Sequence, residues 1–307
     1  EKALAFAQDA GSPEGEANAL SGLGDAYYLR GRMKTSLDHF QRCMDICRAN
    51  GLSRIEIGNS YMVAWTRLYQ NQVSEALAEA LAAAEAAERV GYRRAENGAR
   101  LTAGRIYFEC GDLVASRSHL EKGLVLVEEM GANRFKAFHM IYLARILHAE
   151  DGTQTEAREM AGEALQISRD TGITFLGPWA LSTLALVSDD PGDRQSALDE
   201  GEAIINDGCV GHNYFAFYRD AVEAALAQAD WDAADVYIVS LERYNAPEPL
   251  PWCDFFMQRG AALAAHGRGQ RDTELRRELS RLRDAANQMG IMRSVPSLDA
   301  ALAELTG

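Results

Sequence analysis

The sequence repeats itself with a period of 40 residues, and this periodicity restricts the possible folds more than any other feature. Three segments align without gaps: SGLGDAYYLRGRMKTSLDHF from Ser21, YMVAWTRLYQNQVSEALAEA from Tyr61 and LTAGRIYFECGDLVASRSHL from Leu101. Small residues recur at one equivalent site, namely Gly24, Ala64, Gly104 and Ala144, and a second series is Gly51, Gly91, Gly131 and Gly172. A unit of this length buries its apolar face only by stacking on its neighbours, so the repeat predicts a solenoid.

Each repeat has the pattern of two helices joined by a short turn. In the first helix a small residue is followed three positions later by a large one, as in Gly24 with Tyr27 and Gly104 with Tyr107. Breaks are expected at the turn positions Gly31, Asn71 and Gly111. In the second helix, small and large residues follow an i, i+4, i+7 spacing: Ser36, Phe40 and Cys43, then Ala76, Ala80 and Ala83, then Ser116, Leu120 and Gly123. Small residues beside large ones allow two helices to interlock closely, which predicts helical hairpins.

These positions resemble the tetratricopeptide (TPR) family. The matching residues of the first full unit are Leu20, Leu23, Gly24, Tyr27, Gly31, Ser36 and Phe40. The period is about 40 residues rather than the standard 34, so we expect longer helices. Units of this length resemble those of kinesin light chains and of large bacterial signalling proteins. The resemblance implies that the first helix of each hairpin lines a concave inner wall and that the second helix lies outside.

The expected fold class is all-α, a TPR-like right-handed α-solenoid of about seven helical hairpins with a C-terminal capping helix. Residues 1–172 carry the regular repeats, and residues 173–307 carry divergent repeats and the cap, SLDAALAEL. Turn-like breaks at DDPGD (189–193) and NAPEPLP (245–251) separate the later hairpins. We therefore expect one superhelical domain over 1–307. The chain starts at Glu1 inside a helix-like segment, so we expect it to be cut from a longer protein.

Charge and composition disfavour several classes of partner. The formal net charge is −14 and no dense basic cluster is present, so nucleic acid and anionic membrane surfaces are unlikely ligands of this segment. No apolar run reaches the roughly 18 residues that a membrane-spanning helix needs. The 5 cysteines form no CxxC pair, which favours a reducing, cytoplasmic location.

No catalytic, cofactor or metal motif is evident. GxxxxGK[ST], HExxH and GxSxG are absent, and the GLG and GRG triplets lack the rest of a dinucleotide-binding pattern. His39, Cys43 and Cys47 share one helical stripe that a soft metal could use. Because Cys43 occupies the buried small-residue site of the repeat and no fourth ligand is evident, we expect no metal. The chain is interpreted as a non-enzyme without cofactors.

A stripe of aromatic residues is the candidate for partner binding. Tyr61, Trp65 and Tyr69 lie at i, i+4, i+8 on one face of a first helix, where the TPR register predicts the inner wall. The full set of candidate groove residues is Tyr61, Trp65, Tyr69, Arg105, Phe108, Arg145, His148 and Trp179. Aromatic and arginine side chains are enriched at the centres of interfaces. The alternative is that the rings turn into the core between repeats; it is equally supported for Trp65 and favoured for Phe138.

The C-terminal third carries a second resemblance. EPLPWCDFFMQRGAALAAHGRGQRD, followed by LRRELSRLRDAANQMGI, is similar to the end of bacterial proteins with a class III nucleotide cyclase domain and an AAA-type ATPase before a TPR tail. This implies a regulatory region that binds a protein or peptide in its concave groove; a homo-oligomer is also possible. The alternative is a small-molecule sensor similar to the helical module of maltose-activator-like LuxR-type regulators. The sequence leaves both open.

Overall fold

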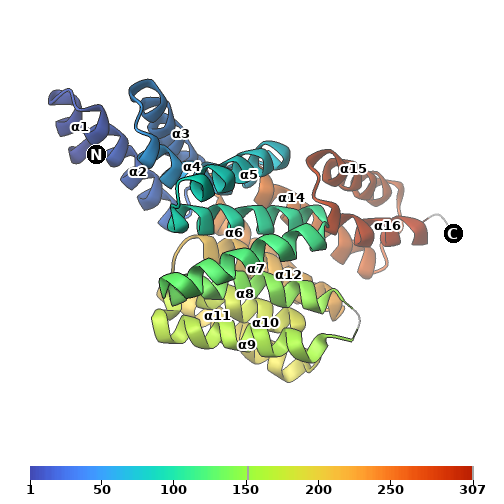
Figure 1. The fold of residues 1–307 in the computed structure, drawn as a ribbon. Helices are drawn as coiled ribbons and strands as arrows, with labels where there is room; N and C mark the ends of the chain where they lie inside the picture. Colours follow the sequence, from blue (N-terminus) through green and yellow to red (C-terminus); the bar gives the residue numbers. More distant parts are fainter. Residues whose placement is uncertain (151, 306–307) are drawn as a thin grey trace.

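The computed structural model describes residues 1–150 and 152–305, which form helices and connecting turns with no strand among them. Figure 1 shows the helices stacked along a curved path between the two termini. The helices are α1 (Lys2–Asp9), α2 (Pro13–Leu29), α3 (Met33–Asn50), α4 (Ser53–Leu68), α5 (Val73–Arg89), α6 (Arg93–Cys110), α7 (Leu113–Met130), α8 (Asn133–His148), α9 (Gln154–Thr171), α10 (Ile173–Val187), α11 (Pro191–Asp207), α12 (His212–Ala227), α13 (Trp231–Asn245), α14 (Pro251–Gly267), α15 (Thr273–Met289), a 3₁₀ turn (Met292–Ser294) and α16 (Val295–Glu304).

Seven antiparallel hairpins, from α2/α3 to α14/α15, form the predicted right-handed solenoid, and α16 follows as the cap. The turns within the hairpins need a left-handed residue. Gly31 and Gly111 have φ angles of 73° and 82°, and Asn71 takes the equivalent position with φ 58°. Asparagine is among the few non-glycine residues that adopt this conformation readily. The predicted breaks and the all-α TPR-like fold are confirmed.

The repeated small-residue sites are the points of closest approach within a hairpin. A Cβ atom on Gly24 would lie 2.8 Å from the Phe40 ring, and one on Gly104 would lie 2.7 Å from Leu120. At the same site a serine of the second helix bonds the glycine carbonyl: Ser116 Oγ donates to the Gly104 oxygen over 2.7 Å. Ser36 makes the same bond to Gly24 over 2.8 Å. The structure thus confirms the register of the repeat.

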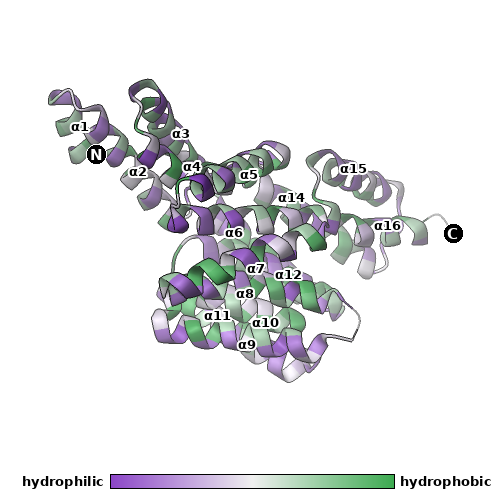
Figure 2. Ribbon diagram, viewed as in Figure 1, coloured by the Kyte–Doolittle hydropathy of each residue, from purple (hydrophilic) through white to green (hydrophobic). Residues whose placement is uncertain are grey.

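The inner helices form a continuous wall. Each inner helix contacts the next one along the series α4, α6, α8, α10, α12 and α14. In Figure 2 the outer helices carry hydrophilic and hydrophobic residues side by side, as amphipathic helices with one exposed face do. No helix in the described part of the chain combines the length and the apolar character required to cross a bilayer.

The superhelix closes on itself, because the end of the first hairpin helix reaches the sixth hairpin. Gly211 N–H donates to the Leu29 oxygen over 2.8 Å, and Tyr244 Oη donates to the Arg30 oxygen over 3.1 Å. The carboxylate of Glu248 accepts from the backbone N–H of Lys34 at the start of α3, over 2.8 Å. These contacts join residues about 180 to 214 positions apart, and we call them the clasp.

Helix α10 begins at Ile173, five residues before Pro178. Pro178 therefore lies inside the helix, where it interrupts the backbone ladder. Asn213 from α12 repairs the interruption: its Oδ1 accepts from Trp179 N–H over 3.3 Å and its Nδ2 donates to the Phe175 oxygen over 2.9 Å. The proline is tolerated because a neighbouring inner helix supplies the missing partners.

Candidate functional site

A groove on the concave side is lined by the inner helices α2, α4, α6, α8 and α10. Its volume is about 660 Å³. The lining includes the apolar or aromatic residues Tyr28, Leu29, Tyr61, Met62, Trp65, Leu101, Phe135, Phe138 and Phe175 and the polar residues Asp25, Arg94, Asn97, Thr102 and Arg134. We call this the inner groove. A concave, largely apolar surface with a few polar groups is the usual form of a ligand site.

The fixed polar group of the inner groove is Asn97. Its side chain is 3% exposed, and its Oδ1 lies 2.8 Å from Nε2 of buried His139. Burial lowers the pKa of His139 to about 3, which keeps the ring neutral. Because Asn97 Oδ1 can only accept, the ring proton lies on Nε2, which donates to Asn97. The Asn97 amide nitrogen has no hydrogen-bond partner among the described residues. Its two N–H groups are held ready to donate to an acceptor in the groove.

The floor of the groove rests on an aromatic layer that we define as Trp65, Phe138, Tyr142 and Trp179. Trp65 and Phe138 line the groove, and Tyr142 and Trp179 pack beneath them. Ring centroids are 6.0 Å apart for Trp65 and Phe138, 5.7 Å for Phe138 and Trp179, and 5.7 Å for Tyr142 and Trp179. The four rings come from α4, α8 and α10, and each is at most 4% exposed. Mutual edge contacts between rings hold the layer in one arrangement. The groove therefore ends on a rigid apolar floor.

Arg105 lies under this floor without a carboxylate partner. Its guanidinium stacks on the rings of Trp65 and Tyr69, with its central carbon 4.3 Å and 4.8 Å from the two centroids. The side chain is 2% exposed, and Nε and Nη1 have no hydrogen-bond partner in the described residues. Aromatic faces stabilise a cation but do not neutralise it. The interior under the groove therefore carries a positive charge.

The predicted aromatic stripe divides between surface and core. Tyr61 and Trp65 line the inner groove, Trp65 with only 4% of its surface exposed. Tyr69, Arg105 and Trp179, predicted as groove residues, do not line the inner groove and are buried beneath it. Tyr69 packs against Phe215 and Trp252, with centroids 5.3 Å and 5.4 Å away. Its neighbours come from α12 and α14, so closure of the superhelix is what buries it. Phe138 is buried in the floor, in agreement with the alternative in which this ring turns into the core between repeats.

Phe108, Arg145 and His148 lie elsewhere, at the C-terminal ends of inner helices. They line a separate hollow of about 210 Å³. Arg145 and Asp220 form a buried ion pair there, and Arg219 Nη1 lies 2.6 Å from Glu109 Oε1. Burial alone would raise the pKa of Glu109, but Arg219 holds it below its usual value. These four charges neutralise each other, and Arg293, which also lines the hollow, stacks on the Phe108 ring. His148 is exposed.

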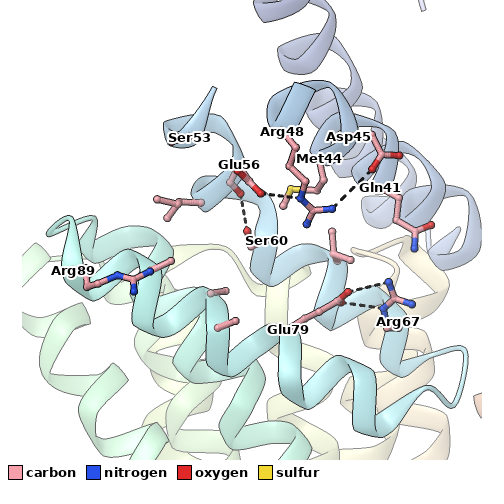
Figure 3. Close-up of a pocket in the computed structure, with 15 residues that line it drawn as sticks. Gln41, Met44, Asp45, Arg48, Ser53, Glu56, Ser60, Arg67, Glu79 and Arg89 are labelled. Atoms are coloured by element: carbon pink, nitrogen blue, oxygen red, sulfur yellow. Dashed lines mark hydrogen bonds and ion pairs between the residues drawn. The ribbon is translucent and has the colours of Figure 1, made fainter. Parts of the chain in front are cut away.

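A further hollow of about 630 Å³ lies on the outer side, between α3 and α5 and above α4 (Figure 3). Within the described residues, its charged side chains are paired with each other, except Arg89. Arg48 Nε lies 2.9 Å from Glu56 Oε1, and Arg67 Nε lies 3.0 Å from Glu79 Oε2. Figure 3 shows these pairs along its walls. We therefore place the candidate site in the inner groove.

The stripe of His39, Cys43 and Cys47 has a structural explanation. Both cysteines are buried beside Ala17 and Leu20, and the His39 ring stacks on Tyr27 with centroids 5.2 Å apart. Across residues 1–150 and 152–305, no group of three or more His, Cys, Asp or Glu side chains is arranged to hold a metal ion.

The sequence analysis did not identify Asn97, Arg94 or Arg134. No sequence signal marks Asn97, since its role depends on His139 in the next repeat. The two arginines do carry a signal, because they are 40 residues apart and occupy the same position in successive repeats.

Comparison with known proteins places the fold. No protein-family model and no curated protein sequence matches the chain. Among solved structures, it is similar to a Rap protein complexed with Competence and Sporulation Factor, with a TM-score of 0.63 and 11% identity over 95% of this chain and 75% of that one. It is also similar to the Rap conjugation gene regulator of plasmid pLS20 in complex with the Phr* peptide, with a TM-score of 0.61 and 14% identity over 91% of this chain and 75% of that one. At this identity the similarity establishes the TPR-like helical repeat fold.

Proposed function

We propose that the chain is a non-catalytic scaffold that binds a peptide segment of a partner protein in the inner groove. The observation that carries the proposal is Asn97, a donor amide fixed by His139 in the wall of an apolar groove. An extended peptide has unpaired backbone carbonyls that such an amide can bond, and side chains that Phe135 and Phe175 can contact. The Phr* peptide complex of the pLS20 Rap regulator, which has this fold, supports the choice of ligand.

The proposal extends to the role of the chain. A groove without catalytic groups fits a regulatory or sensor region of a bacterial multidomain signalling protein in the cytoplasm. Continuous contacts between successive hairpins support treating residues 1–307 as one superhelical domain. A small-molecule sensor is the second candidate, since a hollow of about 660 Å³ lies within the roughly 300–1,000 Å³ of small-molecule sites.

Selection from a random library of dodecamer peptides displayed on phage tests the proposal. We expect selection on the wild-type chain to enrich peptides that the Asn97→Asp variant does not bind. The aspartate keeps an acceptor for His139 but loses the amide donor, so affinity should fall about tenfold or more, as expected for a buried donor replaced by a charge. Asn50→Asp makes the same chemical change on exposed α3 and serves as the control.

Two outcomes would count against peptide binding. One is that no peptide is enriched. The other is that the enriched peptides bind wild type and Asn97→Asp equally well. In that case, thermal-shift measurements with a metabolite library would test the small-molecule sensor. If a metabolite raises the melting temperature of wild type but not of Asn97→Asp, the small-molecule sensor replaces the peptide-binding scaffold as the proposed function.

A further inference from the structure

One arginine per repeat stands along the edge of the inner groove. Arg54, Arg94 and Arg134 are each the second residue of an inner helix, α4, α6 and α8, and lie 40 residues apart. Arg94 and Arg134 line the inner groove, and Arg54 and Arg94 line a hollow of about 310 Å³. The two hollows share Tyr61, Met62, Arg94 and Asp25, so they form one continuous surface. We call the three arginines the arginine ladder.

The arginine ladder makes no close ion pair in the described part of the chain. Its one carboxylate neighbour in the groove lining is Asp25, whose pKa burial raises and Arg94 lowers to a smaller extent. None of the three guanidinium groups forms an ion pair or a side-chain hydrogen bond there. Instead, Arg54 lies 4.9 Å from the Tyr92 ring centroid and Arg134 lies 3.9 Å from that of Phe175. This differs from the outer hollow, where Arg48 and Arg67 are paired with glutamates. The stacked rings orient Arg54 and Arg134 while their N–H groups make no hydrogen bond within the described residues.

The joined groove is positive although the chain as a whole is strongly negative. Its charged lining consists of the three arginines and one carboxylate, Asp25, in a chain of net charge −14. Buried Arg105 adds a further positive charge behind Trp65. Burial lowers the pKa of His212 at the groove floor to about 3, and Arg105 and Arg134 lower it further. A local field opposite in sign to the net charge selects for anionic ligands.

We infer that the ligand of the inner groove is an extended acidic peptide that presents one carboxylate to each arginine of the ladder. Neighbouring packed helices lie roughly 8–10 Å apart. An extended chain in the polyproline II conformation rises about 3.1 Å per residue with about three residues per turn, so every third side chain lies on the same side. One repeat therefore corresponds to about three peptide residues. The matching ligand carries Asp or Glu at every third position, with apolar residues between them for Phe135, Phe138 and Leu101. This inference rests on the proposed function and specifies its ligand.

The test compares synthetic peptides by fluorescence anisotropy. The probe is a fluorescein-labelled dodecamer with Glu at positions 3, 6 and 9 and Ala, Leu and Tyr elsewhere. The two comparison peptides have Gln at those positions, or the three Glu residues placed together. We expect the probe to bind wild type about tenfold more tightly than the Gln peptide, because partly exposed ion pairs each contribute a few-fold. The preference should shrink as salt rises from 50 to 500 mM.

Variants then assign the preference to the ladder. The triple variant Arg54→Gln/Arg94→Gln/Arg134→Gln should bind the probe about tenfold more weakly than wild type. It should also bind the Glu and Gln peptides with equal affinity. The matched control, Arg89→Gln/Arg276→Gln/Arg277→Gln, removes the same charge from exposed positions of α5 and α15. It should stay within about twofold of wild type, since it leaves the groove unchanged.

The outcomes separate this inference from the proposed function. Two outcomes would overturn the inference that the ligand is acidic and still leave the proposed peptide groove in place. One is peptide binding that depends on Asn97 but shows no preference for spaced Glu. The other is an equal loss of affinity in both triple variants. Absence of any Asn97-dependent peptide binding would overturn the proposed function itself. Equal affinity for spaced and clustered Glu would overturn the three-residue register.

Discussion

At the scale of single residues, His212 shows how the floor of the groove is fixed. Its Nε2 lies 2.7 Å from the Phe175 oxygen and must donate, so its Nδ1, 2.8 Å from Tyr28 Oη, must accept. The neutral ring therefore joins α2, α10 and α12 with one defined tautomer. A protonated ring could not accept from Tyr28. Burial opposes that protonation and lowers the pKa of His212 to about 3.

The depressed pKa makes folding stability depend on pH. Below the ordinary histidine value of about 6.5, the unfolded chain takes up a proton that folded His212 refuses, so stability falls as pH drops from about 6.5 to about 3. The free energy of unfolding should lose about 1.4 kcal/mol per pH unit for this histidine in that range. His212→Gln should be less stable at pH 7.5 but lose about 1 kcal/mol less between pH 6.5 and 5.5 in urea unfolding, because the unfolded histidine is only half protonated at pH 6.5. An unchanged pH slope would show that His212 does not control this loss.

At the scale of elements, each hairpin is held together at its small-residue site. Gly104→Leu places a branched side chain where even a Cβ atom would meet Leu120 at 2.7 Å. We expect it to lower the free energy of unfolding by about 1–3 kcal/mol or more, since overpacking forces α6 and α7 apart. Gly162→Leu in α9 is the control, because its added Cβ meets nothing within 4 Å. Equal thermal stability of the Gly104 variant and wild type would contradict the packing described here.

The same comparison explains what could be predicted from the sequence. Gly104 meets Leu120 only 16 positions away in the same repeat, so the periodic pattern contains the information for the hairpin and its register. Tyr69 meets Phe215 and Trp252 across the closed superhelix, and no local pattern encodes that contact. The sequence could therefore predict that Tyr61, Trp65 and Tyr69 share a face. Which of them the closure would bury could not be predicted.

At the scale of the whole molecule, the clasp holds one side of the inner groove in place. Tyr28 and Leu29 line the groove, and the clasp binds this end of α2 to the start of α12. The backbones cross closely: a Cβ atom on Gly211 would lie 2.1 Å from the Gly31 nitrogen. Because no covalent link joins these segments, the clasp consists of separate hydrogen bonds. Because the clasp contacts join different hairpins, we expect that breaking them leaves the contacts within each hairpin in place.

Glu248 is the charged part of the clasp. Its carboxylate accepts from Lys34 N–H over 2.8 Å and from Thr35 N–H over 3.3 Å, and so caps the positive end of α3 from 214 positions away. Removing it with Glu248→Ala should cost about 1–2 kcal/mol of local stability, as the loss of a helix cap does. In hydrogen exchange, the amides at the start of α3 should then lose about tenfold protection or more, while those of α8 and α9 keep theirs.

Glu242→Ala on exposed α13 is the matched control and should leave all protection unchanged. Because the ligand groove and the clasp share the end of α2, a peptide bound in the groove should restore part of the protection lost in Glu248→Ala. Loss of protection spread evenly over all hairpins would instead mean that Glu248 stabilises the whole solenoid. Unchanged exchange at the start of α3 would mean that the contacts of Gly211 and Tyr244 hold the superhelix closed without it.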